Sequence, residues 1–411
     1  MEKVKQSRVI LHSDLNNFFA SVETMLHPEF KGKALAVCGD PEKRHGIVLA
    51  KSEAAKKCGI KTGMTIREAS ERCKDLIVTV PHHEEYVKVS EKVRRIYERY
   101  TDKVEPFGID EAWLDVTSRR SSRSGKEIAD ELRAVIAKEI GITASVGVSF
   151  NKVFAKLGSD YKKPDATTVI TEENFRDTVW KLPVSDLLYV GRHTAEKLTE
   201  YNIRTIGDLA AVDPDFLQRK FGKAGTVLYA YANGLDEEPV LGFEEEENTK
   251  SVGNSMTAYR DVVSVEDAKI PLFDLADSVA MRLAEAGLGK ASTVQLFVRD
   301  SLLRSSTRQC KIPPSDLADV FARTALSLLA ENYDFSVPIR SLGISVRDFS
   351  DGSGQTSLFD TPEKDEKKQK LQQTIYSLRD RFGEHAIERA VSYEDPKLTR
   401  DPEKHGNTEK K

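Results

Sequence analysis

The chain has 411 residues and a formal net charge of −4 at pH 7, with 39% hydrophobic and 31% charged residues. This length exceeds what one hydrophobic core supports, and a domain size of ~150 residues predicts two to four domains. The slightly negative charge excludes a protein that is basic throughout, so any contact with nucleic acid has to come from a local cationic groove.

Neither the cysteines nor the N-terminus indicates an extracellular or membrane protein. Cys38, Cys58, Cys73 and Cys310 have no CxxC spacing and no histidine partner at zinc-binding intervals. They are typical of reduced thiols in a cytoplasmic protein. No stretch reaches transmembrane length. We expect a soluble, cytoplasmic protein without a membrane contact.

The first 175 residues alternate strands with helices. A strand at 8–12 leads into a helix over 15–23, where apolar residues recur at helical spacing. Asp14 lies at the junction, where its carboxylate or the Ser13 hydroxyl could simply cap the helix. Further strands are predicted at 34–39, 46–50, 76–80, 143–149 and 167–170, and further helices within 52–73 and over 86–100, 125–140 and 151–163.

The most informative stretch of this part is VEPFGIDEAWLDV, residues 104–116. Pro106-Phe107-Gly108 interrupts an apolar strand that then resumes, which predicts a β-hairpin with Asp110 and Glu111 at its turn. Neighbouring side chains on a strand point to opposite faces, so two adjacent carboxylates reach one cation only at a bend. Alone, the pair could be solvated turn acids. With Asp14 as a third acid, a metal site becomes the better interpretation.

From residue 184 the composition becomes helical, with helices predicted over 194–201, 205–211 and 213–221. Two interpretations remain open for this segment. One is a helix-hairpin-helix whose backbone amides hold a DNA phosphate, and the other is a plain helical connector.

An acidic linker at Glu244–Glu247 separates this segment from a second α/β unit over 249–349. Strands of the second unit carry cations that could form a binding face or protect an exposed edge: Lys250, Arg299, Arg304, Arg308 and Arg347. Residues 350–411 are predicted to be a flexible tail with one short helix. Within it, Gln355–Phe359 has an apolar tip suited to docking into a partner's groove.

Five motifs together resemble the Y-family DNA polymerases, in the DNA polymerase IV (DinB) branch: HSDLNNFFASVE, GIDEAWLDV, SVGVSFNKVFAKLGSDYKKP, the helix-hairpin-helix and QTSLFD. The resemblance implies a multidomain α/β (α+β) right-hand polymerase. Its parts would be a palm (8–19 and 76–175), small fingers (20–75), a helical thumb (176–243), an α/β little finger (249–349) and a tail with a clamp-binding peptide at 355–360.

This resemblance implies a template-directed, error-prone DNA polymerase that adds dNTPs to a primer 3′ end in translesion synthesis. Asp14, Asp110 and Glu111 would be catalytic and, with the Leu15 backbone carbonyl, would hold two Mg²⁺ ions ~4 Å apart. One ion would activate the primer hydroxyl, and the other would hold the triphosphate. The implied partners are primed template DNA, dNTPs and a sliding clamp, with the polymerase acting as a monomer.

The resemblance also implies a nucleotide-binding set: Asn17, Phe18, Phe19, Lys56 and Lys163. Phe19 matches the steric gate, an aromatic ring that leaves no room for a ribose 2′-hydroxyl, whereas Phe18 could equally be a core residue. Lys163 matches a lysine that contacts the triphosphate as a point charge. The residues that match the clamp-binding peptide are Gln355, Ser357, Leu358 and Phe359.

The sequence departs from the family pattern in the fingers. Glu53 stands where the family has tyrosine, and Lys56 stands where it has arginine. A carboxylate repels a triphosphate and lysine lacks the two-pronged geometry of arginine, so weaker nucleotide binding is expected. Gly108 replaces a serine, and Tyr189 replaces a glycine of the thumb hairpin.

These departures keep a non-enzymatic alternative open, a catalytically weakened accessory factor that binds DNA and the sliding clamp. A nucleotidyl cyclase is the alternative enzyme class, because related palm folds also use carboxylates with two metals. The sequence contains no GGDEF-like signature, and a cyclase would leave the thumb, the little finger and the clamp peptide unexplained.

Overall fold

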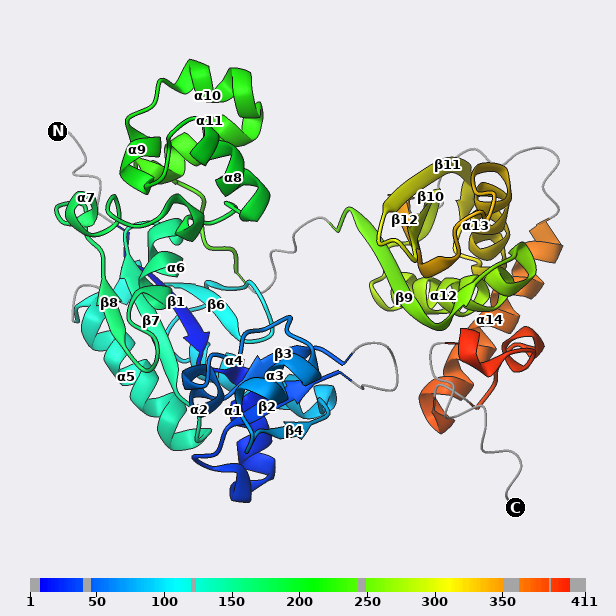
Figure 1. Cartoon of the computed structure of the whole chain (residues 1–411), viewed down its shortest axis with the longest axis horizontal. Coiled ribbons are helices and arrows are strands. Elements are labelled where there is room, and N and C mark those ends of the chain that lie inside the picture. Colours follow the sequence, from blue (N-terminus) through cyan, green and yellow to red (C-terminus); the bar gives the residue numbers. More distant parts are fainter. Residues whose placement is uncertain are drawn as a thin grey trace. The chain divides into compact units, whose positions relative to one another are not determined.

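The computed structural model describes residues 8–39, 46–119, 123–242, 249–350, 362–383 and 386–399. It divides into two compact units, Met1–Glu246 and Glu247–Lys411, which are described separately (Figure 1). The predicted acidic linker and the predicted clamp-binding peptide, residues 355–360, lie outside the described residues. No helix in the described ranges combines the length and the apolar composition that a membrane crossing requires.

The first unit is built on a five-stranded sheet with the order β5-β6-β1-β7-β8. Its strands are β1 (Ile10–Leu15), β5 (Val104–Pro106), β6 (Glu111–Asp115), β7 (Ala144–Ser149) and β8 (Thr167–Val169). The central strand β1 runs antiparallel to both β6 and β7. In this register Asp14 lies opposite Glu111 on one side and opposite Ser145 on the other.

Helices cover both faces of this sheet. They are α1 (Phe18–Leu26), α4 (His83–Tyr97), α5 (Gly125–Glu139) and α6 (Lys152–Tyr161). Leu11 packs with α4 and α5 in one core, whereas its neighbour Ile10 packs with Ala155 of α6 in another. A Cβ at Gly147 of β7 would lie 1.8 Å from the Ala155 carbonyl oxygen, so only glycine allows α6 this close to the sheet.

A smaller three-stranded sheet with the order β3-β2-β4 follows α1 in the chain. Its elements are η1 (Pro28–Phe30), β2 (Leu35–Cys38), β3 (Val48–Lys51), α2 (Glu53–Lys57), α3 (Ile66–Arg72) and β4 (Ile77–Thr79). Ser52 caps α2, and Thr65 and Glu68 form a capping box at α3. These caps fix two short helices that propensity alone would not stabilise.

The remainder of the first unit is helical. After η3 (Thr117–Arg119) and β8 come α7 (Phe175–Thr178), η4 (Val184–Asp186), α8 (Arg192–Glu200), α9 (Ile206–Ala210), α10 (Pro214–Phe221) and α11 (Lys223–Ala232). The chain then returns to the sheet, because the Arg8 guanidinium donates to the carbonyls of Asp236 at 2.9 Å and Glu238 at 2.7 Å. The helices α7 and α11 were not predicted from the sequence.

The second unit has a four-stranded antiparallel sheet with the order β11-β10-β12-β9 (Figure 1). Its elements are β9 (Ser251–Val262), α12 (Val265–Glu285), β10 (Lys290–Asp300), β11 (Ser305–Ser315), α13 (Ala318–Asn332) and β12 (Ile339–Ser350). Leu275 of α12, Phe321 of α13 and Leu342 of β12 belong to one buried core.

The C-terminal part differs from the flexible tail predicted for residues 350–411. The structure contains α14 (Pro362–Phe382), η5 (Ala390–Tyr393) and η6 (Pro396–Leu398), with Ser392 and Leu398 buried. Arg389 donates to Asp277 of α12 at 2.9 Å and to Asp319 of α13 at 2.8 Å. This segment is therefore part of the second unit, and its charged composition reflects ion pairs with α12 and α13.

Candidate active site

The sheet register places Asp14 at the same end of the sheet as Asp110 and Glu111, two adjacent acids that lie far from Asp14 in the sequence. Asp14 is near the end of β1, and its register partner Glu111 is the first residue of β6. The Leu15 amide donates to the Asp110 carbonyl at 3.0 Å, so the turn that carries Asp110 closes onto the end of β1. All three acids are half-buried. The predicted hairpin and its adjacent acids are thus present.

Asp110 is the acid most affected by the negative charge of its neighbours. Burial raises its pKa, and the nearby carboxylates of Asp14 and Glu111 raise it further, to about 6. Its carboxylate sits where a positive charge would be most stabilising. This is the electrostatic condition expected of a cation-binding acid.

Two lysines from α6 and the segment after it hold the other two acids. Lys163 Nζ lies 2.6 Å from Asp14 Oδ2, and Lys156 Nζ lies 2.5 Å from Glu111 Oε2. Burial raises the pKa of Asp14, and Lys163 only partly offsets this effect. Burial also acts to raise the pKa of Glu111, but hydrogen bonds from His12 and Lys156 outweigh it and lower that pKa to about 2.

Lys156 and His12 were not singled out from the sequence. His12 is completely buried, with Nε2 3.4 Å from Glu111 Oε2 and Nδ1 2.8 Å from Ser159 Oγ. Burial lowers the pKa of His12. In the predicted helix 151–163, Lys156 and Lys163 are two turns apart, a spacing that predicts a common side for both lysines. In the structure α6 ends at Tyr161, and Lys163 follows it.

The donor atoms of these residues suit a divalent cation, but the side chains are not arranged around one point. Within the described ranges, no three acid, histidine or cysteine side chains are gathered as a metal site. Two of the acids are bonded to lysines instead. Carboxylate and carbonyl oxygens are nevertheless the ligands that Mg²⁺ prefers, and the raised pKa of Asp110 reflects an excess of negative charge.

Next to the acids lies the N-terminus of α1, where backbone amides can receive an anion. Asn17 precedes the helix with φ +50°, and its side-chain amide donates to Glu53 Oε1 at 3.1 Å. Phe18 is 2% exposed and packs in the core, so only its backbone is available to a ligand. Phe19 is half-buried and stacks on Tyr86, with the ring centroids 4.2 Å apart.

Glu53 connects the segment predicted to be the fingers with the start of α1. Lys56 Nζ lies 3.7 Å from Glu53 Oε1, in a pair whose side chains are 52% and 36% exposed. Glu53 therefore bridges Lys56 of α2 and Asn17 at the start of α1. The sequence predicted that both Asn17 and Lys56 serve the nucleotide, and the structure links them through the one residue that departs most from the family pattern.

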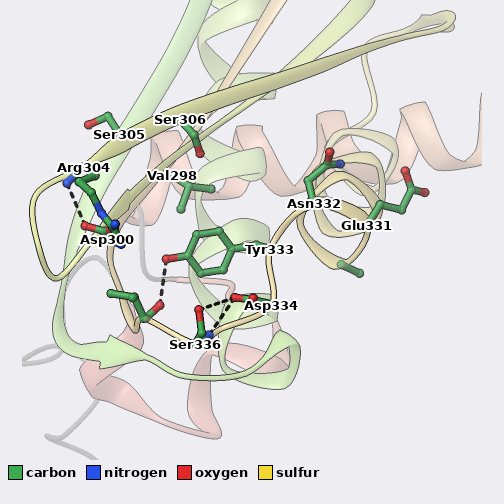
Figure 2. A pocket seen from close by; sticks show the side chains of 12 residues that line it. Val298, Asp300, Arg304, Ser305, Ser306, Glu331, Asn332, Tyr333, Asp334 and Ser336 are labelled. Atoms are coloured by element: carbon green, nitrogen blue, oxygen red, sulfur yellow. Dashed lines mark hydrogen bonds and ion pairs between the residues drawn. The ribbon is translucent and has the colours of Figure 1, made fainter.

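A larger hollow in the second unit does not belong to this site. It has a volume of about 730 Å³ and lies between the β10–β11 hairpin and the end of α13 (Figure 2). Arg304 pairs with Asp300 at 2.7 Å, and the Tyr333 hydroxyl donates to the Val337 carbonyl at 2.9 Å. The predicted catalytic and nucleotide-binding residues all belong to the first unit.

Comparisons with known proteins cover almost the whole chain. Residues 13–160 match the impB/mucB/samB family, residues 249–358 match the C-terminal domain of that family, and residues 185–236 match the thumb domain of DNA polymerase-iota. The last match favours the helix-hairpin-helix interpretation of the helical segment over a plain connector.

Curated relatives have similar length and consistent names. A DNA polymerase IV of Acetivibrio thermocellus is 46% identical over 397 residues, covering 96% of this chain and 99% of the relative. A DNA polymerase IV of Pelotomaculum thermopropionicum is 38% identical and covers 93% of this chain and 95% of the relative. A solved Y-family DNA polymerase chimera superposes with a TM-score of 0.73 at 25% identity, covering 83% of this chain and 99% of the chimera.

Proposed function

Because the chain belongs to the Y-family DNA polymerases, in the DNA polymerase IV branch, we propose that Asp14, Asp110 and Glu111 are the catalytic acids of its DNA synthesis. The protein is a DNA-directed DNA polymerase of the error-prone, translesion type. It adds dNTPs to a primer 3′ end opposite a template. The observation that carries the proposal is the β1–β6 register, which sets Asp14 opposite Glu111 with Asp110 closing the turn.

The three acids and the Leu15 carbonyl would hold two Mg²⁺ ions. When bound, these ions make the primer hydroxyl a better nucleophile and neutralise charge on the triphosphate and the leaving pyrophosphate. Asp14, Asp110 and Glu111 would each supply carboxylate oxygens to these ions. Asp110 suits this role because burial and the carboxylates of Asp14 and Glu111 raise its pKa, and a bound cation would offset that repulsion.

Two lysines interact directly with these acids. Lys163 and Lys156 donate charge-assisted hydrogen bonds to Asp14 and Glu111, and each bond favours the ionised form of the carboxylate that accepts it. We assign Lys163 a second contact, to the incoming triphosphate, because a cation beside Asp14 is within reach of the same phosphates. Asn17, Phe18 through its backbone, and Lys56 would complete the phosphate contacts.

Phe19 would be the steric gate. Its ring is half-buried at the first turn of α1, beside Asn17 and close to the proposed phosphate site. A ribose 2′-hydroxyl would need the space that a flat aromatic ring fills, so the ring favours deoxyribonucleotides.

The domain boundaries inferred from the sequence are proposed for the folded part: palm 8–19 and 76–175, fingers 20–75, thumb 176–243 and little finger 249–349. The little finger would be extended by the C-terminal segment up to residue 399, because α14, η5 and η6 belong to the same compact unit. We further propose a cytoplasmic monomer that is tethered to a sliding clamp through Gln355, Ser357, Leu358 and Phe359.

Primer extension tests this function. With Mg²⁺ and dNTPs the wild type should make short products, and Asp110→Asn should reduce incorporation about a thousandfold, since several kcal/mol of charge stabilisation are lost. Glu98→Gln, at an exposed position at the end of α4, is a matched control that should leave the rate unchanged.

The accessory-factor alternative is favoured by one observation, the acid Glu53 between Asn17 and Lys56. It makes an opposite prediction in the same assay. A wild-type protein that binds primed DNA but incorporates no nucleotide, even at millimolar dNTP, would support the accessory factor and contradict the polymerase.

A further inference from the structure

Glu23 is a fully buried carboxylate that the proposed chemistry does not use. It lies on α1 one turn after Phe19 and is 0% exposed. Its Oε1 accepts a short hydrogen bond from the Tyr86 hydroxyl, one from His82 Nδ1 at 3.0 Å and one from the His82 amide at 3.3 Å. A buried carboxylate is tolerated only with such partners, so Glu23 and the start of α4 depend on each other.

Tyr86 connects Glu23 to Phe19. The Tyr86 ring is 0% exposed and lies nearly parallel to the Phe19 ring, at 15° and a centroid distance of 4.2 Å. His83 contacts both rings edge-on, at 5.7 Å from Phe19 and 5.6 Å from Tyr86. Tyr86 therefore supports one face of the Phe19 ring, and His83 packs nearly perpendicular to that ring.

The hydrogen bond to Glu23 fixes the position of the Tyr86 ring. A tyrosine held at both ends, by the backbone of α4 and by its hydroxyl, cannot slide along the ring that it supports. Burial and the bond to Glu23 raise the pKa of Tyr86, so its hydroxyl stays protonated and keeps donating. Because Phe19 rests on this surface, the position of its ring depends on Glu23.

We propose that Glu23 is a positioning residue for sugar selection, which acts through Tyr86 to hold the Phe19 ring against the 2′ position of the incoming nucleotide. This inference rests on the proposed function, since it takes Phe19 as the steric gate. Glu23 touches neither the nucleotide nor the metal ligands, and its effect is on the geometry of the gate.

The test compares kcat/KM for dCTP and CTP opposite template guanine in the full-length enzyme. Glu23→Ala and Tyr86→Phe should each lower the dCTP preference about threefold to tenfold, mostly through faster CTP use, because each removes the hydrogen bond that holds the support. Glu23→Gln should keep most of the preference, since its amide oxygen still accepts from Tyr86 and its NH₂ can donate to His82 Nδ1.

A matched control is available in the same domain. Tyr100→Phe removes another tyrosine–glutamate bond, from the Tyr100 hydroxyl to Glu131 at 3.2 Å, which has no contact with Phe19. It should leave the sugar preference unchanged. Tyr86→Phe keeps the buried ring, so it remains informative if Glu23→Ala does not fold.

Phe19→Ala separates the inference from its premise. If Phe19→Ala does not lower the dCTP preference, Phe19 is not the gate, and the steric-gate assignment itself is overturned. If Phe19→Ala lowers the preference while Glu23→Ala and Tyr86→Phe do not, the gate stands and the positioning role is overturned. An equal loss of dCTP and CTP incorporation in Tyr86→Phe would overturn it too, because that result indicates only a structural contribution.

Discussion

Glu53 is the residue whose charge would oppose a triphosphate at the proposed nucleotide site. Its carboxylate lies between Asn17 and Lys56, at the end of α1 that is proposed to receive the triphosphate. Unit charges about 4 Å apart interact by about 1 kcal/mol in water, and by more where solvent is excluded. We therefore expect Glu53→Gln to lower the KM for dNTPs severalfold with little change in kcat, measured by steady-state single-nucleotide incorporation.

Glutamine at position 53 retains an acceptor for Asn17, so the substitution removes charge with little change in shape. Glu71→Gln is the matched control, on α3 of the same domain, where Glu71 pairs with Arg67 at 3.0 Å. A KM that rises in Glu53→Gln would mean that the carboxylate helps to hold Lys56 in its binding position, contrary to this expectation.

The raised pKa of Asp110 makes a prediction about stability. Its pKa is about 6 in the folded protein against an ordinary value of 3.8, so the folded state binds the proton more tightly than the unfolded chain. Ionised Asp110 therefore destabilises the folded state. This destabilisation is absent below about pH 4, where the acid is protonated, and it develops as the pH rises through 6. Asp110→Asn should stabilise the protein by about 1–2 kcal/mol at pH 7.5 in EDTA, and by nothing near pH 4.

Thermal or urea unfolding of Asp110→Asn and wild type at both pH values measures this difference. Adding Mg²⁺ should raise the stability of the wild type more than that of the variant, because only the wild type has all three of the proposed acidic ligands. A variant no more stable than wild type at pH 7.5 would show that the lysines already neutralise the repulsion.

The places of the three acids in the fold could be predicted from the sequence, whereas the lysines that contact them could not. Asp110 and Glu111 stand out as adjacent acids in a hairpin, and Asp14 stands out at a strand end. The contact of Lys156 with Glu111 depends on which face of the sheet α6 covers, and that depends on the close approach at Gly147. Such information lies in tertiary packing and not in local spacing.

Among the elements, the C-terminal segment shows where composition misleads. Residues 362–399 are rich in charge and poor in apolar residues, which favours disorder on average. In the structure the charges are matched to fixed partners, as Arg389 is to Asp277 and Arg260 is to Asp395. Composition counts charges without locating their partners. The sequence therefore predicted most strands and helices up to residue 350, α7 and α11 excepted, but it did not predict the packing of this segment.

Removing Arg389 should detach this segment. Its guanidinium donates to both Asp277 and Asp319, so Arg389→Ala leaves two carboxylates with fewer partners. We expect a loss of about 1–3 kcal/mol in the unfolding free energy of the second unit, measured by urea denaturation of residues 249–399. Arg323→Ala removes only the ion pair between Asp319 and Arg323, whose side chain is 74% exposed, and it should cost less than about 0.5 kcal/mol. Equal effects of the two substitutions would argue against a docked segment.

At the scale of the whole molecule, the two units are proposed to have different roles: the first carries out catalysis, and the second binds DNA. All proposed catalytic and nucleotide-binding residues lie in the first unit, and the second unit contributes strands that carry Arg299, Arg308 and Arg347. Since the net charge of the chain is −4, affinity for DNA has to come from such local cations. The two units should therefore be separable in function as well as in structure.

A fragment of residues 1–242 tests this separation. We expect its KM for primed DNA to rise about tenfold to a hundredfold and its salt dependence to become shallower, because fewer phosphates are neutralised. Its kcat at saturating DNA should stay within a few fold of the full-length enzyme, since the acids, the lysines and Phe19 are all retained. Primer extension over a DNA titration at two salt concentrations, with circular dichroism to verify folding, measures both quantities.

Full-length Asp110→Asn is the opposite case, with DNA affinity kept and kcat lost. If kcat of a folded fragment falls as far as it does in Asp110→Asn, the second unit contributes to the catalytic geometry itself, and chemistry and DNA holding are not divided between the units.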